Sequence, residues 1–213
     1  MNKISINQIE SFLLESADIL RGNLDASEFK DYIFSIMFLK RISDAFDEEV
    51  EKIKIKLREG GKDDLYIGKM IRDPLQFNNF YISENSHWSL LKDLKHDIGT
   101  GLNKACEEVE ELNPSLEGVL VSIDFNKKEK ITDKKLRELL SHFCKYNLRD
   151  SDFENIDLLG QAYEYMVKYF ADSAGKKGGE FYTPSEVVNL LVRLISPNPG
   201  MRIYDPTCGS GGM

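Results

Sequence analysis

A run of apolar residues with almost no polar face most constrains how this 213-residue chain can fold. It follows Glu28 and carries large side chains nearly all round: Phe29, Tyr32, Ile33, Phe34, Ile36, Met37, Phe38 and Leu39. A helix that is apolar all round has to be covered by other elements. The charged stretch 44–58 continues it as far as Gly60-Gly61, where a helix can end. We therefore predict a long central helix in a helical bundle.

Four further segments have apolar side chains three and four residues apart, which is typical of amphipathic helices. They span residues 6–20, about 102–112, 133–146 and 159–170. The last has the clearest stripe, formed by Leu159, Ala162, Tyr163, Met166, Val167 and Phe170. These segments predict the helices that surround the central one.

The stretch between the central helix and residue 102 is less regular. Residues 73–86 have no clear period and are interpreted as a structured loop. Trp88 follows, and we expect it to anchor the core rather than to serve as a platform on which a base stacks. A helix is predicted after it, with the apolar residues Leu90, Leu91, Leu94 and Ile98.

The charge balance limits the classes of partner. The chain has 28 Lys and Arg against 36 Asp and Glu, a formal net charge of −8. Sequence-independent binding of nucleic acid depends on clustered cations that attract phosphates. Any DNA contact must therefore be local or supplied by a partner. The one basic cluster, residues 127–137, is interrupted by Glu129 and Asp133, and it is interpreted as a solvated helix start or, alternatively, as a contact surface.

Cysteines and histidines show no metal-site spacing. Cys106, Cys144 and Cys208 form no Cys-x-x-Cys pair, which fits a reducing cytoplasm and predicts no metal site. The three histidines are expected to have ordinary structural roles: His87, His96 and His142. No apolar stretch approaches the ~20 residues of a membrane span, and glutamates near the N-terminus argue against an export signal.

Two elements near the C-terminus carry the chemistry. After a Gly/Lys-rich stretch at 175–179, Thr183 can cap a helix, Pro184 suits its first position and Glu186 completes a capping box. About 20 residues later a short apolar segment ends at Asp205, followed by the glycine-rich loop 206–213. Alone, this loop is equally a plain tight turn. Paired with the upstream helix start, it is typical of a nucleotide-binding βα unit, in which backbone N–H groups meet a polar ligand.

The strings Gly-Gly-Glu-Phe-Tyr-Thr-Pro at 178–184 and Asp-Pro-Thr-Cys-Gly-Ser-Gly-Gly-Met at 205–213 resemble the modification subunit of type I restriction-modification systems. Members of that family are DNA adenine methyltransferases that use S-adenosylmethionine. Upstream stretches at 17–22, 38–44, 123–126 and 159–165 look like its helical N-terminal domain. The resemblance therefore covers nearly the whole chain.

The resemblance implies that the Phe-Tyr-Thr-Pro element and the glycine loop jointly line the cofactor pocket. S-adenosylmethionine would be bound by Glu180, Phe181, Tyr182, Thr183, Pro184, Ser185, Asp205, Gly209, Ser210 and Gly211. The free N–H groups of the helix start can meet the methionine carboxylate, and glycines let the backbone approach the ligand. Cys208 is expected to be a small packing residue, because methyl transfer needs no covalent nucleophile.

The family's catalytic motif, Asn/Asp-Pro-Pro-Tyr/Phe, holds the amino group of a flipped adenine and does not occur in the 213 residues. We therefore assign no catalytic residue. The expected fold is mainly α, with an N-terminal helical bundle domain over 1–150 and a connecting helix and Gly/Lys hinge over 151–179. The truncated start of a Rossmann-like S-adenosylmethionine-dependent methyltransferase domain follows over 180–213. Without partner strands, residues 202–205 are expected to be coil or an isolated edge.

Two functions follow from the resemblance. In the first, the chain is the N-terminal part of a cytoplasmic methyltransferase subunit that modifies adenine N6 in double-stranded DNA. It would act in a complex with a specificity subunit, a second methyltransferase subunit and a restriction subunit, and would be inactive alone. In the second, the chain is a non-catalytic helical module that docks onto those subunits or onto DNA. Composition does not distinguish the two.

Overall fold

The computed structural model describes residues 3–22, 24, 26–121, 123–155, 157–174 and 183–208. The helices are α1 (Ile6–Leu20), α2 (Ala26–Glu59), α3 (Asp64–Met70), α4 (Trp88–Leu91), α5 (Ile98–Leu112), α6 (Asp133–Phe143), α7 (Leu158–Ala174) and α8 (Ser185–Ile195). Short 3₁₀ turns lie at Pro74–Gln76, Pro114–Leu116 and Asp150–Asp152. In the described ranges there is no named strand, only two isolated bridges. The predicted mainly α fold is confirmed.

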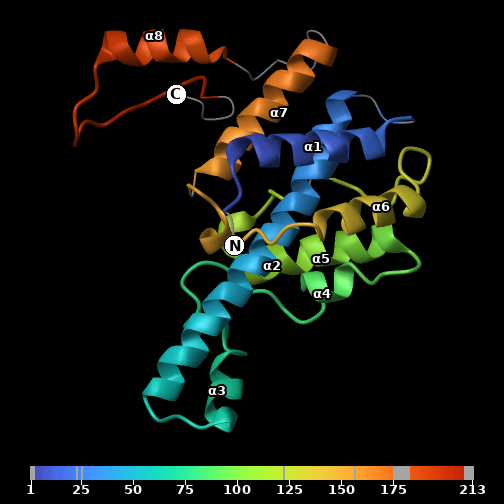
Figure 1. Ribbon diagram of the computed structural model, residues 1–213, viewed down its shortest axis with the longest axis vertical. Coiled ribbons are helices and arrows are strands. Elements are labelled where there is room, and N and C mark those ends of the chain that lie inside the picture. The colour runs from blue at the N-terminus through green and yellow to red at the C-terminus, as the bar shows by residue number, and fades with distance from the viewer. Residues whose placement is uncertain are drawn as a thin grey trace.

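The apolar run forms the central helix, as predicted. α2 is a single 34-residue helix through the middle of the bundle, and α1, α4, α6 and α7 all pack against it (Figure 1). Its N-terminal half buries Phe29, Tyr32, Ile33, Ile36, Met37, Leu39 and Ile42. The helix ends at the predicted glycines: Gly61 has a φ of +71°, and the N–H of Lys62 donates to the Leu57 carbonyl over 3.0 Å.

The amphipathic segments also form helices near their predicted limits. α1 begins and ends where predicted and buries Ile9, Phe12, Leu13, Ala17 and Leu20. α5 begins a turn earlier than expected, and α6 ends at Phe143 rather than at Tyr146. α7 places Leu158, Ala162 and Met166 in the same core cluster as α1 and α2.

The helix predicted after Trp88 is wrong in its length. Trp88 is buried, as expected of a core anchor, but α4 ends at Leu91 and a new helix begins at Ile98. The break includes Asp97, whose φ of +48° is left-handed and cannot continue a right-handed helix. Leu90 is consequently 52% exposed instead of buried.

The C-terminal part of α2 projects beyond the bundle and pairs with α3, a helix that the sequence did not predict (Figure 1). Residues 52–72 are called the arm below. α3 begins at Asp63, whose carboxylate accepts a hydrogen bond from the N–H of Tyr66 over 2.8 Å. Ile67 is its one buried residue. The loop 73–86 that follows contains a 3₁₀ turn and no longer element, as predicted.

His142 has a structural role at the contact of α1 and α6, as expected. Its ring stacks on Phe12 with 4.3 Å between the centroids, and its Nε2 lies 2.8 Å from the Phe12 carbonyl oxygen. Burial lowers the pKa of His142, although the Phe12 carbonyl opposes this shift. The ring is therefore held in its neutral form inside the core.

The start of α5 lies against the backbone of residues 124–126. A β-carbon on Gly99 would lie 2.3 Å from the Phe125 carbonyl oxygen. Asn103 secures the same segment, because its Oδ1 accepts from the N–H of Phe125 over 2.9 Å and its Nδ2 donates to Asp124 over 2.8 Å. The absence of a side chain at Gly99 permits this close approach.

Gly99→Ala is expected to lower the free energy of unfolding by about 1–3 kcal/mol, because the Phe125 backbone has to move. Gly68→Ala in α3 is the matched control: nothing lies within 4 Å of its β-carbon position. Alanine there should raise the stability by about 0.5–1 kcal/mol through helix propensity. Urea unfolding followed by circular dichroism measures both variants, and equal stabilities would contradict the close approach.

Candidate functional site

The residues predicted to bind the cofactor divide into two groups. Six lie outside the described residues: Glu180, Phe181, Tyr182, Gly209, Ser210 and Gly211. The other four belong to the described segment 183–208: Thr183, Pro184, Ser185 and Asp205. The structure therefore shows the start of α8 and the beginning of the glycine loop.

α8 begins one residue later than predicted. Pro184 occupies the N-cap position, with φ −53° and ψ 136°, and its carbonyl accepts from the N–H of Val188 over 3.1 Å. The predicted cap by Thr183 is therefore wrong, and proline has no side-chain acceptor that could cap the helix instead. A helix start of this kind offers backbone N–H groups to an anionic ligand.

Asp205 organises the turn that opens the glycine loop. Its carboxylate accepts from the N–H of Thr207 over 2.8 Å and from the Thr207 hydroxyl over 3.3 Å, which makes an Asx turn. In the described structure residues 201–205 form no strand, as expected, and the side chains of Ile203 and Tyr204 are 78% and 86% exposed.

The apolar face of α8 is also open to solvent. Its large side chains are 36–72% exposed: Val187, Leu190, Leu191, Leu194 and Ile195. Monomeric proteins rarely expose so large a contiguous apolar surface, and such a surface is typical of a face that packs against another element or another chain. Helix and extended segment together have the pattern of one βα layer, in which a helix packs on a sheet.

A polar row on α2 fixes the segment that leads into α7. The Asp44 carboxylate forms a buried ion pair with Lys40 and accepts from the N–H of Leu148 over 2.7 Å. Arg41 donates to the Leu148 carbonyl over 2.7 Å and pairs with Asp150. Both backbone groups of Leu148 are thus bound by side chains from neighbouring turns of α2.

Glu48 completes this row one turn further along α2. Its carboxylate accepts from the N–H of Asp150 over 3.0 Å. Burial tends to raise the pKa of Glu48, but the hydrogen bonds from Ser151 and from the Asp150 backbone outweigh it, so the pKa is lowered. We call Lys40, Arg41, Asp44 and Glu48 the α2 clamp.

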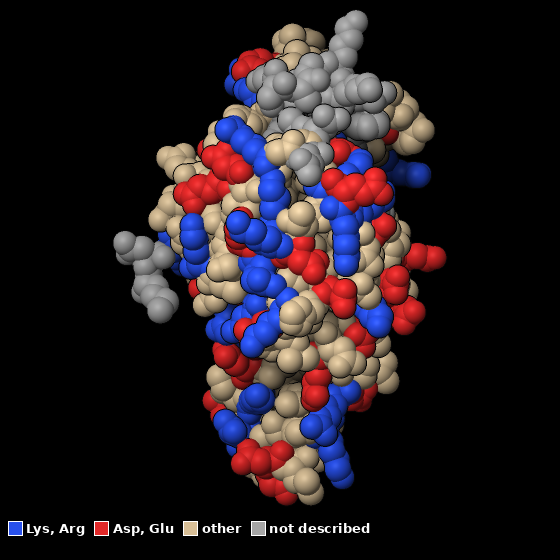
Figure 2. All heavy atoms as spheres, turned by 90° about the vertical axis from the view of Figure 1, so that its right-hand side faces the viewer, with Lys and Arg blue, Asp and Glu red and all other residues tan. Residues whose placement is uncertain are grey.

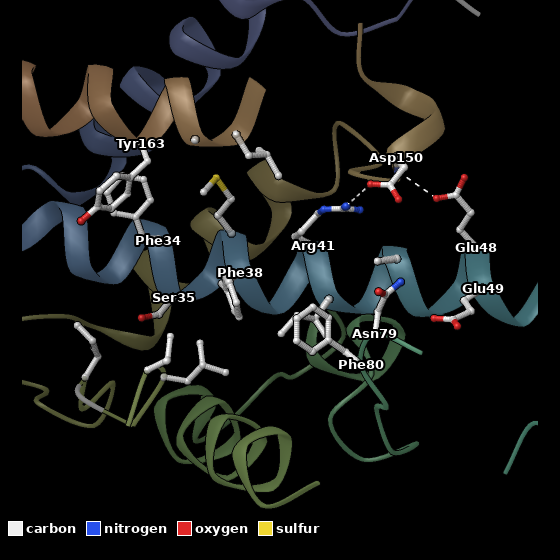
Figure 3. A pocket seen from close by; sticks show the side chains of 18 of the residues that line it. Phe34, Ser35, Phe38, Arg41, Glu48, Glu49, Asn79, Phe80, Asp150 and Tyr163 are labelled. Atoms are coloured by element: carbon white, nitrogen blue, oxygen red, sulfur yellow. Dashed lines mark hydrogen bonds and ion pairs between the residues drawn. The ribbon is translucent and has the colours of Figure 1, made fainter. Parts of the chain in front are cut away.

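A groove with a volume of 830 Å³ runs along the same side of α2. Its aromatic lining comes from Phe34 and Phe38 of α2, Tyr163 of α7 and Phe80 of the 73–86 loop (Figure 3). The rings of Phe34 and Tyr163 have centroids 4.5 Å apart. Seven of the twelve α2 residues that line the groove recur at alternating three- and four-residue spacing: Asp31, Phe34, Phe38, Arg41, Ala45, Glu48 and Lys52. This is the spacing with which one helix packs along another.

Most polar groups in the groove already have partners. Arg41 binds Asp150, and Glu49 accepts from the backbone N–H of Asn78 over 2.9 Å. Asp31, Lys30 and Asn79 are exceptions, since within the described part of the chain their side chains have no hydrogen bond or ion pair. Burial raises the pKa of Asp31, and the nearby charge of Lys30 reduces that shift without cancelling it.

The groove was not predicted, although its α2 spacing is visible in the sequence. The structure also shows the surroundings of Cys106 and of the basic cluster at 127–137. Cys106 is buried, which raises the pKa of its thiol to about 12 and makes it unreactive. In the basic cluster, Lys135 donates to the Leu20 carbonyl over 3.1 Å and Arg137 to the Lys95 carbonyl over 2.6 Å, so part of the cluster serves internal contacts.

Among the described residues, no three His, Cys, Asp or Glu side chains are grouped so that they could hold a metal ion. None of the described helices is both long enough and apolar enough to cross a membrane.

Two family models match consecutive parts of the chain. The model described as HsdM N-terminal domain matches residues 9–143, and the model described as N-6 DNA Methylase matches residues 154–213. The first match covers α1 to α6, and the second covers α7, α8 and the glycine loop. The boundary between the matches falls beside the segment that the α2 clamp holds.

Curated relatives show the same assignment. The type I restriction enzyme MpnII methylase subunit of Mycoplasma pneumoniae is 28% identical over 97% of this chain and 43% of its own length. The MjaVIII methylase subunit of Methanocaldococcus jannaschii is 28% identical over 100% of this chain and 36% of its own length. The HindI methylase subunit of Haemophilus influenzae is 36% identical over 52% of this chain and 26% of its own length. The chain thus spans less than half the length of these relatives.

Asp44→Ala is expected to lower the free energy of unfolding by about 3–5 kcal/mol, because it leaves the Lys40 ammonium buried without its partner. The double variant Lys40→Met/Asp44→Leu should recover much of that loss, since apolar side chains of similar volume often replace a buried ion pair at little cost. Asp93→Ala on the surface is the control for loss of a carboxylate. Urea unfolding measures all three, and equal losses in the single and double variants would contradict the clamp.

Proposed function

Because the chain belongs to the HsdM family, the methylase subunits of type I restriction enzymes, we propose that it serves methyl transfer from S-adenosylmethionine to adenine N6 in double-stranded DNA. The observation that carries the proposal is the order of the two family matches along one chain, a helical HsdM domain followed by an N-6 DNA methylase region. In this reaction the adenine amino nitrogen displaces the sulfonium methyl group directly. No covalent intermediate with the protein is needed.

The proposal assigns cofactor binding to the two motifs at the C-terminal end. Thr183, Pro184 and Ser185 lie at the start of α8, where backbone N–H groups suit the carboxylate of the methionine part. Asp205 opens the glycine loop, where a carboxylate suits the hydroxyl or ammonium groups of the same ligand. Residues 180–182 and 209–211 adjoin these positions in sequence and complete the proposed site. The domain limits 1–150, 151–179 and 180–213 remain part of the proposal.

The proposed activity belongs to a cytoplasmic complex rather than to this chain alone. The 213 residues contain no Asn/Asp-Pro-Pro-Tyr/Phe motif to hold the amino group of a flipped adenine. The proposed partners are a specificity subunit, a second methylase subunit and a restriction subunit. Selection of the DNA site is assigned to the specificity subunit.

The isolated chain is expected to transfer no methyl group, because it lacks the motif that holds the target amine. The measurement is incorporation of tritiated methyl from S-adenosylmethionine into plasmid DNA, with a complete type I methyltransferase complex as the positive control. Turnover by residues 1–213 alone would contradict the proposal.

Weak cofactor binding by the same chain is expected to depend on Asp205. Isothermal titration with S-adenosylmethionine should give a small signal that Asp205→Ala abolishes. Asp93→Ala removes an exposed carboxylate on the bundle and should leave the signal unchanged. Micromolar binding that survives Asp205→Ala would exclude the proposed half-site.

A second candidate is a non-catalytic assembly module, and the groove along α2 favours it. Its helical spacing and aromatic lining suit a segment of another subunit. Size-exclusion chromatography with a co-expressed specificity subunit, together with the cofactor titration, separates the two candidates. Co-elution without any heat from S-adenosylmethionine would support the module, whereas cofactor binding would support the methyltransferase half-site.

A further inference from the structure

Charge is distributed very unevenly between the arm and the rest of the chain. The arm, residues 52–72, has seven Lys and Arg and three Asp and Glu, a net charge of +4. The basic cluster at 127–137 also has a net charge of +4, with six Lys and Arg against two Asp and Glu. Because the whole chain has a net charge of −8, the part outside both segments carries −16. Such an asymmetry between parts of one chain is a sign of a local polyanion contact.

The position of the arm separates this positive charge from the acidic bundle. The C-terminal turns of α2 and the whole of α3 extend past the other helices (Figure 1). In Figure 2 the arm forms the narrow lower end of the molecule, and blue Lys and Arg side chains project from its flanks. A projecting element of this kind can reach a ligand while the acidic bundle stays at a distance.

Two of the three acidic side chains of the arm bind other residues of the arm. The Asp63 carboxylate caps α3 by accepting from Tyr66, and Asp64 pairs with Arg58 over 3.2 Å. Lys62 lies over the ring of Tyr66, with 5.1 Å between Nζ and the ring centroid.

Four other cations of the arm have no such partner. Within the described residues, no hydrogen bond or ion pair involves the side chains of Lys54, Lys56, Lys69 and Arg72. Lys56, Lys69 and Arg72 are exposed, and Lys54 is partly buried. These four charges are not used in contacts within the described structure and are available to a polyanion outside the chain.

We propose that the arm binds the phosphate backbone of double-stranded DNA, through Lys54, Lys56, Lys69 and Arg72. The proposal rests on the proposed function in one respect, that DNA is the substrate. Lysine ammonium groups bind phosphates as point charges and do not distinguish base edges. The arm therefore positions the duplex and does not read its sequence.

The test is fluorescence anisotropy of the 1–213 chain with a labelled mixed-sequence duplex of roughly 30 base pairs, between about 25 and 200 mM NaCl. Two arm variants are compared, Lys54→Gln/Lys56→Gln and Lys69→Gln/Arg72→Gln. Lys92→Gln/Lys95→Gln removes the same charge from exposed positions on the bundle and is the matched control. Circular dichroism checks that each variant retains its helices.

Each arm variant should weaken binding at about 50 mM salt at least tenfold and lower the slope of log K against log salt by up to about 1.8, because each lost phosphate contact removes about 0.9. The bundle variant should bind as the wild type does. A bundle variant as weak as the arm variants, or no wild-type binding at about 25 mM salt, would overturn the proposal.

Two further results would distinguish DNA binding by the arm from lipid binding and from the proposed methyltransferase function. Arm-dependent binding to vesicles of anionic lipid, with none to the duplex, would also overturn the assignment to DNA. Unchanged DNA binding by the arm variants, alongside methylation of DNA by the complete complex, would reject the arm and leave the proposed methyltransferase function intact.

Discussion

A buried ion pair on α2 fixes the segment that leads into α7, and the N-terminal residues lie against the same segment. Two charges inside an apolar core are costly unless every hydrogen-bonding group is satisfied. Here Lys40 and Asp44 satisfy one another, and Asp44 also binds the N–H of Leu148. Arg41 takes the carbonyl of the same residue, so residues 148–150 fit against α2 in one register only. The N-terminus joins the same arrangement, because Ile4 donates to the Asp152 carbonyl over 2.7 Å.

The bundle was predictable where a helix is long and buries a regular stripe. α1, α2, α5, α6 and α7 were all anticipated from spacing, because ten or more residues with a 3.6 period leave little ambiguity. The prediction failed where local backbone geometry overrides the pattern. Leu91, Leu94 and Ile98 have helical spacing, yet the left-handed Asp97 divides them between α4 and α5. α3 was missed because its seven residues bury only Ile67, too little for a periodic signal.

The two candidate sites also differ in how far the sequence predicted them. The cofactor motifs are local strings, so the sequence alone pointed to them, and the error at Thr183 is a shift of one position in a helix start. Such shifts are common because N-cap geometry depends on the backbone of the preceding residues. The groove combines α2, α7, the loops around residues 78–80 and 119–123, and the 3₁₀ turn at Asp150, which are far apart in the sequence. Packing between segments that are distant in the sequence cannot be read from local patterns. Only the alternating spacing from Asp31 to Lys52 on α2 is visible in the sequence.

The boundary between the two family matches is not a boundary in the packing. α7 falls within the N-6 DNA methylase match, but Leu158, Ala162 and Met166 share one core with α1 and α2. The α2 clamp holds the segment before α7, and this core holds the helix itself. The turns of α7 from Leu158 to Met166 are therefore part of the bundle core. The bundle thus extends past residue 154, where the N-6 DNA methylase match begins, and sequence families and packing units divide this chain at different places.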